Sequence, residues 1–573
     1  MTAPSEHEVD FTVQAVENLV TQFSGALDFY RELVQNSIDA GSAAVEVWME
    51  YEPGAEDEGT IAIHVDDFGE GMNEEIIDGQ LTKLFSSSKD GDLTKIGKFG
   101  IGFVSIFAPD PRAVLLHTGR GGEAWEVMFH PDRSFTKTRL ETPVEGTQIT
   151  LYIAGDRGRY RELVTGSRET LRRWCSHSDV DITFEDRSGG AGPEAINLPF
   201  EVPGECLTRS AAEGTEVVLA FHGEPEYGFY NKGLALTVSR DGASLLGEHA
   251  QRLAHVGFKV KSRYLEHTLS RDTVVREGNF LKAIELVLAA ADGPLQTALI
   301  EQIAAIGQQR AWSIAELRRY GELLGYLARE PDTALARHEE RPLLRVVDGS
   351  AVSLAQLWEA ASEDRRVFVA DALGPLAEQL IAAGTPVLLA ARAPGERSPV
   401  AGVAGLVERY VRHRHRRTLR GRLARLGLPF STPELLVCAP EAAFVRVEMS
   451  TPRPEEARLI DAAAKLLAAV DAGYRRLVAC TLPEDGPLFV LGRTISPMMQ
   501  RPPDGRLFLD RRPRRPEAAV HVGHPLFRRW IDLQKTAPAL AAYCLAKDLL
   551  LIEDRLLGSD IALMAAARPE VAA

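Results

Sequence analysis

Three short motifs, which follow one another between Glu32 and Phe103, most strongly constrain what this chain can fold into. The helix motif, Glu32–Ala40, reads ELVQNSIDA; the strand-end motif, Asp66–Met72, reads DDFGEGM; the glycine motif, Gly97–Phe103, reads GKFGIGF. Each pattern is common by itself, since polar helix faces and glycine turns occur in most proteins. Together and in this order, they predict one site built from a helix, the end of a strand and a glycine-rich turn.

Residues 9–40 predict two helices, and the helix motif lies on the second of them. Apolar residues with helical spacing support that second helix: Leu27, Tyr30, Leu33, Val34 and Ile38. Glu32, Asn36 and Asp39 are four and three positions apart, so two carboxylates and one amide share another face. Two carboxylates and an amide form an unusual face to bury on an amphipathic helix, which marks the three residues as candidate site residues.

Alternating apolar and polar residues at 44–52 and 60–67 predict a hairpin, and the strand-end motif follows its second strand. Gly69 and Gly71 allow the backbone to approach a flat ring, with the Asp67 carboxylate beside them. The glycine motif leads into a short predicted helix, whose N-terminal N–H groups suit phosphate oxygens. The two glycine-bearing motifs therefore predict a pocket for a ring that carries phosphates.

Four further predicted strands extend the sheet behind these helices: residues 112–119, 123–130, 134–140 and 147–153. They complete an α/β two-layer sandwich that ends near Gly155. A chain of 573 residues exceeds the roughly 100–200 residues of a typical domain, so further domains follow. The fold class is therefore α/β multidomain, with four expected regions: 1–155, an α/β domain at 156–295, a helix-rich α/β region at 296–431 and an α/β region at 432–573.

In the second region, strand patterns at 180–185, 215–221, 234–240 and 255–262 precede a strongly apolar helix at 280–291. The hydrophobic fraction of 45% and the charged fraction of 25% are ordinary for a soluble globular protein. We expect no membrane span, because no apolar stretch approaches the ~20 residues that one requires. The N-terminal residues lack the pattern of a signal peptide, so a cytoplasmic location is expected. The five cysteines are scattered and never spaced as CxxC, so buried or reduced thiols are expected.

The order of the three motifs, ExxxNxxD, DxGxG and GxxGxG, resembles the ATP-binding domain of the gyrase, heat-shock-protein-90, histidine-kinase and MutL (GHKL) superfamily. The resemblance covers about residues 25–150. It implies a Bergerat-type α/β sandwich that binds ATP and Mg²⁺. Asn36 is then the Mg²⁺ ligand, Asp67 accepts a hydrogen bond from the adenine amino group, and Thr147 recognises adenine through water.

The same resemblance assigns further residues to the nucleotide: Asp39, Gly69, Gly71, Met72, Lys89, Gly97, Lys98, Phe99, Gly100, Ile101, Gly102 and Phe103. Residues 84–95, which include Lys89, resemble the lid that closes over ATP; an ordinary surface loop is the alternative. Glu32 occupies the position where the hydrolases of the superfamily carry glutamate and the kinases carry asparagine. A carboxylate there can accept a proton from water, so hydrolysis is favoured over phosphotransfer.

A second catalytic candidate is Arg271, in the segment Tyr264–Asp272. This segment resembles the middle domain of heat-shock-protein-90 chaperones, where a Ser-Arg-Glu sequence sends its arginine to the γ-phosphate; Asp272 departs from that sequence. Arg276 and Lys261 are rival candidates, and a surface ion pair is the plain alternative for Arg271. If Arg271 acts in this way, the site is completed only when the second domain docks.

The resemblance is closest to bacterial heat-shock-protein-90-like chaperones, which implies a nucleotide-driven homodimer that binds a client protein. The C-terminal helix 538–556 is either a dimer contact or an ordinary core helix. The alternatives are a nucleotide-dependent scaffold and an ATPase clamp on nucleic acid, of the MutL or microrchidia type. The net charge of −16 opposes nucleic-acid coating. Two arginine clusters, residues 412–425 and 511–515, favour nucleic-acid binding. The alternatives for these clusters are an exposed helix face and ion pairs with acidic groups of the same chain.

Overall fold

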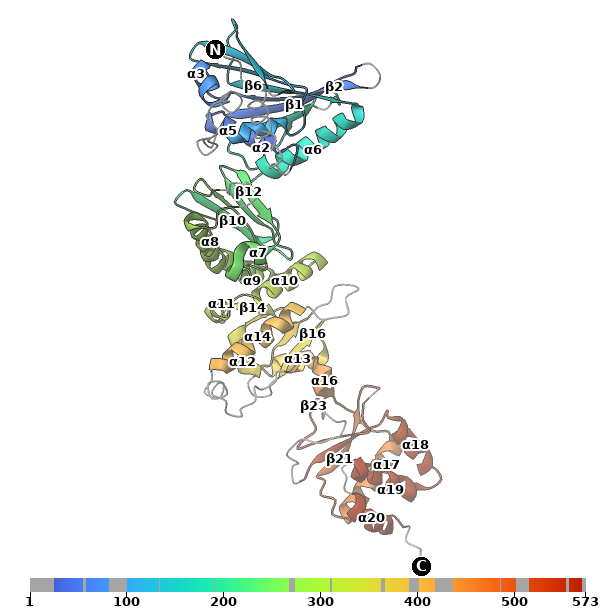
Figure 1. The fold of residues 1–573 in the computed structure, drawn as a ribbon. Helices are drawn as coiled ribbons and strands as arrows, with labels where there is room; N and C mark the ends of the chain where they lie inside the picture. The colour runs from blue at the N-terminus through green and yellow to red at the C-terminus, as the bar shows by residue number, and fades with distance from the viewer. Residues whose placement is uncertain are drawn as a thin grey trace, which may run out of the picture. The chain divides into compact units, whose positions relative to one another are not determined.

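The computed structural model describes residues 25–54, 58–81, 100–132, 134–190, 192–266, 274–309, 312–361, 366–390, 401–417, 436–484, 486–500, 515–552 and 556–568. The chain divides into two compact units, Met1–Ala298 and Leu299–Ala573. Both units contain helices and strands in several separate sheets, which confirms the α/β multidomain class (Figure 1).

The first unit begins with an eight-stranded sheet in the order β5-β4-β3-β6-β2-β1-β7-β8. Its strands are β1 (Ala44–Glu52), β2 (Gly59–Asp67), β3 (Ala113–Arg120), β4 (Glu123–Phe129), β5 (Phe135–Arg139), β6 (Thr147–Gly155), β7 (Asp181–Asp186) and β8 (Glu194–Ala195). The predicted hairpin β1–β2 is confirmed, as are the four strands that follow it. Because β7 pairs in parallel with β1, the sheet continues past residue 155, where the sequence placed the end of the sandwich.

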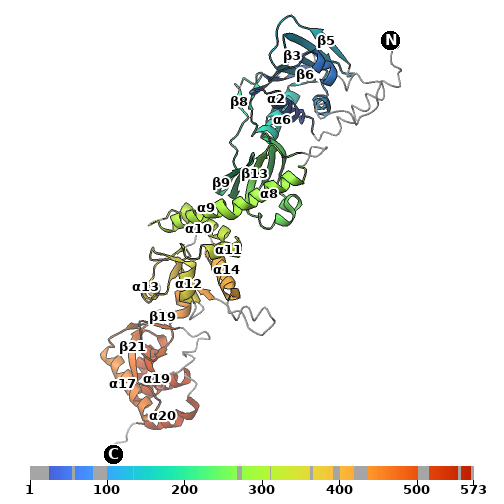
Figure 2. The same cartoon turned by 90° about the vertical axis from the view of Figure 1, so that its left-hand side faces the viewer.

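Three helices lie on one face of this sheet: α2 (Phe29–Asp39), α5 (Gly100–Phe103) and α6 (Arg157–Cys175) (Figures 1 and 2). The apolar side of α2 packs into the core through Phe29, Tyr30 and Leu33, whose burial removes apolar surface from water. Tyr30 Oη also donates to Ser167 Oγ at 2.9 Å, which joins α2 to α6. The short elements α3 (Glu74–Ile76), η2 (Ile77–Leu81) and η4 (Val104–Phe107) complete this part.

A five-stranded sheet follows in the order β12-β11-β13-β10-β9. Its strands are β9 (Glu205–Ala212), β10 (Thr215–Phe221), β11 (Tyr227–Asn231), β12 (Leu234–Ser239) and β13 (Val256–Ser262), with α7 (Gly242–Leu246) and η5 (Gly247–His249) between the last two. Helix α8 (Gly278–Ala290) packs on this sheet (Figure 2). The predicted strand at 180–185 is present, but as β7 it belongs to the eight-stranded sheet.

Helix α8 continues through η6 (Ala291–Leu295) into α9 (Gln296–Gly307). This stretch, Gly278–Gly307, is long and apolar enough to cross a membrane by length and composition, so the expectation that no such stretch exists is wrong. Polar residues interrupt the apolar ones along this helix, so no uninterrupted apolar run marks its full length in the sequence. Half of its most apolar window is buried inside the protein, which is equally typical of a core helix.

The second unit begins within α9, at Leu299. It continues with α10 (Ile314–Leu327), α11 (Asp332–Arg337), the pair β14 (Pro342–Arg345) and β15 (Ala351–Ser353), and α12 (Leu354–Ala361). A three-stranded sheet is formed by β16 (Arg366–Ala370), β17 (Val387–Leu389) and β18 (Leu436–Cys438), with α13 (Pro375–Ala382) and α14 (Ala401–Arg417). Since β18 pairs with β16, this strand joins the preceding sheet rather than the C-terminal one.

The C-terminal part of the second unit contains a four-stranded sheet in the order β20-β21-β24-β22. Its strands are β20 (Glu448–Met449), β21 (Arg476–Thr481), β22 (Phe489–Gly492) and β24 (Glu517–His521), and a separate pair is formed by β19 (Phe444–Arg446) and β23 (Met498–Gln500). The helical elements are α16 (Pro440–Ala443), α17 (Pro454–Ala469), α18 (Pro525–Gln534), α19 (Pro538–Ile552), η7 (Leu556–Gly558) and α20 (Asp560–Ala566). Helices α17 and α19 pack against each other.

Candidate functional site

The helix motif and the strand-end motif meet at the carboxylate of Asp67, the last residue of β2. Asp67 Oδ1 accepts a hydrogen bond from the Gly69 N–H at 2.9 Å, and Oδ2 lies 3.2 Å from Ser37 Oγ on α2. In the sheet, Asp67 is the register partner of Thr147 on β6. The structure therefore brings together three segments that the sequence assigned to one site.

Burial determines the protonation behaviour of Asp67. Desolvation raises the pKa of its carboxyl group, and hydrogen bonds from the Gly69 N–H, the Ser37 hydroxyl and the Thr147 N–H oppose that shift. These donors stabilise the carboxylate as an acceptor. The half-buried group is thus partly shielded from water and held in one orientation.

Gly69 and Gly71 are needed where backbone segments approach closely. A Cβ at Gly71, where φ is +63°, would lie 2.2 Å from the Gly119 carbonyl oxygen and 2.8 Å from that of Gly146. A Cβ at Gly69 would lie 2.7 Å from the Ala40 Cβ, directly after α2. Protein backbone, and not only a bound ring, therefore requires glycine at both positions.

Two threonines fix the backbone after the strand-end motif. Thr118 Oγ1 on β3 accepts from the Met72 N–H at 2.9 Å, donates to the Gly146 carbonyl at 3.0 Å and lies 3.1 Å from Thr147 Oγ1. Sequence reasoning missed Thr118. The alternation along β3 could have indicated it, because Val114, Leu116 and Thr118 are every second residue and therefore face the same buried side of the sheet.

Two serines of the same region were also missed. Ser37 Oγ lies 2.9 Å from the Leu33 carbonyl oxygen as well as near Asp67. Ser42 Oγ accepts from the Phe68 N–H at 2.9 Å and donates to the Ala44 carbonyl at 2.6 Å. Small hydroxyl residues beside a motif are too common in sequences to indicate such contacts.

The polar face of α2 has a buried end and an exposed end. Glu32 is buried, with 6% of its surface exposed, and Asn36 is half-buried. Asp39 is exposed, and its carboxylate binds two donors: Lys232 Nζ at 2.7 Å and Gln35 Nε2 at 3.2 Å. The Lys232 contact comes from the turn between β11 and β12 in the five-stranded sheet.

Several predicted site residues lie outside the described part of the chain: Lys89, Gly97, Lys98, Phe99 and Arg271, with the rest of the expected lid at 84–95. Gly100, Ile101, Gly102 and Phe103 form α5, which contacts α2. The two rivals of Arg271 already bind other groups. Lys261 on β13 pairs at 3.3 Å with Asp179, which lies just before β7 of the eight-stranded sheet, and Arg276 Nη1 donates to the Ser244 carbonyl at 2.7 Å.

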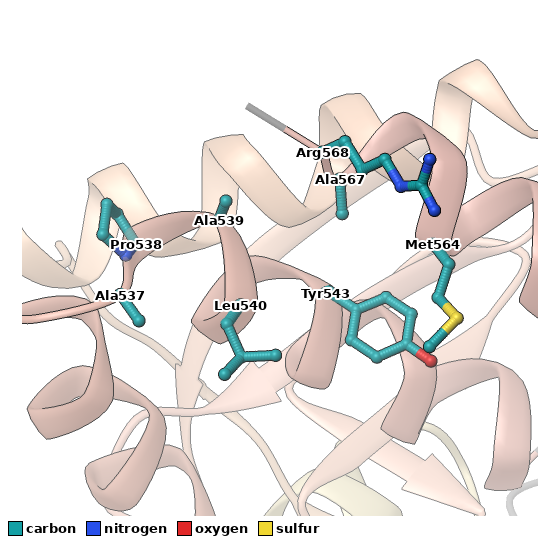
Figure 3. A pocket seen from close by; sticks show the side chains of 8 residues that line it. All are labelled: Ala537, Pro538, Ala539, Leu540, Tyr543, Met564, Ala567 and Arg568. Carbon is teal, nitrogen blue, oxygen red and sulfur yellow. The ribbon is translucent and has the colours of Figure 1, made fainter. Parts of the chain in front are cut away.

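Two hollows differ in chemistry. One, of about 320 Å³, adjoins the strand-end motif at Gly69 and Glu70 and is bordered by Arg120, which pairs with Glu70 at 2.6 Å. The other, of about 440 Å³, lies in the second unit between α19 and α20 and is lined mainly by apolar side chains (Figure 3). The first belongs to the region of the predicted site, and the second does not.

Comparison with known proteins identifies the domain that carries these motifs. Residues 23–145 match the family described as histidine kinase-, DNA gyrase B-, and HSP90-like ATPase. Three similar proteins are each named "Chaperone protein HtpG". The one from Nitrobacter hamburgensis is 31% identical over 151 residues, which are 23% of this chain and 24% of that protein.

The relative from Methylococcus capsulatus is 29% identical over 158 residues, 24% of either chain, and that from Rhodospirillum rubrum is 27% identical over 149 residues, 23% of either chain. The matched part thus spans about a quarter of the length of these relatives. With the helix and strand-end motifs joined at Asp67, residues 23–145 form a domain of the histidine kinase-, DNA gyrase B- and HSP90-like ATPase family.

Proposed function

We propose that this chain is an ATP-binding and ATP-hydrolysing molecular chaperone similar to heat-shock protein 90. The observation that carries the proposal is the Asp67 carboxylate, held by Ser37 of α2 and Gly69 within a domain of the ATPase family. A desolvated, oriented carboxylate is a strong acceptor for an amino group such as that of adenine. The names of the three relatives extend the proposal from ATP binding to chaperone function.

In this proposal Asn36 would hold Mg²⁺, which would offset the negative charge of the phosphates when nucleotide is bound. An amide oxygen is a hard ligand, and Mg²⁺ usually takes one or two protein ligands besides phosphates and water. The half-buried Asn36 on α2 fits that requirement. Glu32, one turn earlier and buried, accepts the proton of the attacking water.

The remaining nucleotide contacts are proposed for Asp39, Thr147 and the residues of the glycine motif, with Lys89 in the lid. Arg271 is proposed to reach the γ-phosphate, where a guanidinium stabilises developing negative charge. Lys261 is paired with Asp179, and Arg276 is bonded to the Ser244 carbonyl, which supports Arg271 over these rivals.

A cytoplasmic homodimer that binds a client protein completes the proposal. A second copy of the chain is the proposed occupant of the apolar hollow between α19 and α20 (Figure 3). In a two-fold interface, a projecting side chain and the hollow that receives it lie on the same surface. Ile561, which is 87% exposed, lies one helical turn before Met564, a residue that lines the hollow.

An ATPase clamp on nucleic acid is the second candidate, favoured by the arginine clusters. Within the described part of the first cluster, Arg414 Nε lies 3.6 Å from the Glu339 carboxylate. Such an ion pair reduces the charge available for phosphates, which supports the chaperone.

The deciding experiment measures ATP turnover with duplex DNA and with an unfolded client protein across a salt series. We expect stimulation by the client. Stimulation by DNA alone, lost steeply as salt is added, would overturn the chaperone proposal.

Glu32→Gln should lower ATP turnover about 10²- to 10⁴-fold with ATP affinity retained, since only the base is removed. Unchanged turnover would place the base elsewhere.

A further inference from the structure

The tight turn between β11 and β12 brings a lysine of the five-stranded sheet to the helix motif. Lys232 and Gly233 both have positive φ, +48° and +80°, as in two-residue hairpin turns of type I′. A Cβ at Gly233 would lie 1.7 Å from the His177 carbonyl oxygen, so the turn packs directly on the chain that follows α6. The Asp179 N–H donates to the Lys232 carbonyl at 3.2 Å, which fixes the backbone of the lysine.

From this fixed backbone, the Lys232 ammonium reaches the last residue of α2. Lys232 Nζ lies 2.7 Å from Asp39 Oδ1, while Gln35 Nε2 binds Asp39 Oδ2. Asp39 lies three residues after Asn36, one helical turn along the same face. The lysine therefore neutralises the carboxylate that is nearest along α2 to the proposed Mg²⁺ ligand.

Stability does not account for this arrangement. The Lys232 and Asp39 side chains are 40% and 31% exposed, and exposed ion pairs contribute little to stability. The positive φ of Lys232 is unfavourable for a non-glycine residue and offsets that small gain. The consequence of the pair is therefore the placement of a cation.

We propose that Lys232 is a positioning residue for the nucleotide site: it holds and neutralises Asp39, so that α2 presents less negative charge to a bound triphosphate. This inference rests on the proposed function. Without the lysine, the uncompensated negative charge of the Asp39 carboxylate would weaken phosphate binding. The adenine end of the site, at Asp67, is unaffected. Phosphate binding at α2 thus depends on Lys232, which belongs to the five-stranded sheet.

The test compares binding of Mg–ATP and of adenosine to the full chain by calorimetry. Lys232→Gln should weaken Mg–ATP binding about three- to fivefold, as expected for one uncompensated charge several ångströms away in high dielectric, and should leave adenosine binding within about twofold. The loss should shrink at high salt. Lys232→Arg should restore the affinity, and Asp39→Asn combined with Lys232→Gln should bind Mg–ATP no worse than Asp39→Asn alone.

The matched control is Arg209→Gln, which removes two ion pairs of similar exposure, with Glu201 and Glu216, from β9 of the same sheet. It should leave both affinities unchanged. A Lys232→Gln variant that binds Mg–ATP like the wild type, or that loses Mg–ATP and adenosine equally, would overturn the inference alone. A wild-type chain that binds neither ligand would overturn the proposed function and the inference with it.

Discussion

Two adjacent aspartates show how position on a strand decides the role of a side chain. Asp67 ends β2 and contacts α2 through Ser37. Asp66, one residue earlier, points to the opposite face of the sheet, where Glu46 is its register partner on β1. Burial raises the pKa of Asp66 to about 7, and the charge of Glu46 adds to that shift. The same side chain therefore has different chemistry on the two faces.

Asp67→Asn should weaken ATP binding roughly tenfold, because an amide replaces one charged acceptor and charge-assisted hydrogen bonds contribute about 1.5–3 kcal/mol. Calorimetric titration with ATP measures the loss. Asp66→Asn is the matched control, since it changes the neighbouring carboxylate on the other face and should leave ATP affinity unchanged. Equal losses in the two variants would contradict the role proposed for Asp67.

At the scale of elements, the β1–β2 pairing makes stability depend on pH. The folded-state pKa of Asp66 lies above its ordinary value of 3.8, so its contribution to stability is fully present below pH 3.8 and is lost as pH rises through about 7. Asp66→Asn removes this titration. The variant should be more thermally stable than the wild type at pH 8, and this gain should be much smaller at pH 5. Melting curves at both values measure the difference, and an equal gain at both would contradict this cause.

The strand-end motif depends on close backbone packing between elements. Gly71→Ala should lower the free energy of unfolding by more than Gly121→Ala, measured by chemical denaturation. Both glycines have φ of +63°, but a Cβ at Gly121 meets no described atom within 4 Å, whereas at Gly71 it meets two carbonyl oxygens. The shared positive φ costs roughly 1 kcal/mol. Equal losses would show that the close approach to Gly119 and Gly146 is relaxed at little cost.

At the scale of the whole molecule, the proposed dimer depends on apolar surface in the second unit. Ile561→Lys should convert the dimer to monomer in sedimentation experiments, because an ammonium group cannot enter a mainly apolar hollow whose charged lining residue is Arg568. Leu373→Lys is the control, since Leu373 is an exposed leucine of the same unit outside the hollow. A variant dimer as stable as the wild type would exclude this surface as the interface.

The sequence by itself determined α2, the β1–β2 hairpin and the neighbouring positions of the helix and strand-end motifs. Helical spacing and strand alternation are local properties, and each recurs within a few residues. The domain family also follows from the motifs, and the comparison at residues 23–145 agrees.

Only the tertiary structure decided which groups complete the site. Thr118 binds Met72 and Gly146 from another strand, and Lys232 reaches Asp39 from a separate sheet. The parallel pairing of β7 with β1 extends the sheet beyond its expected end. In each case the partners are far apart in the chain, and no local pattern specifies which distant residue will meet a given side chain. Packing of the sheets sets those contacts, and with them the charge around the helix motif.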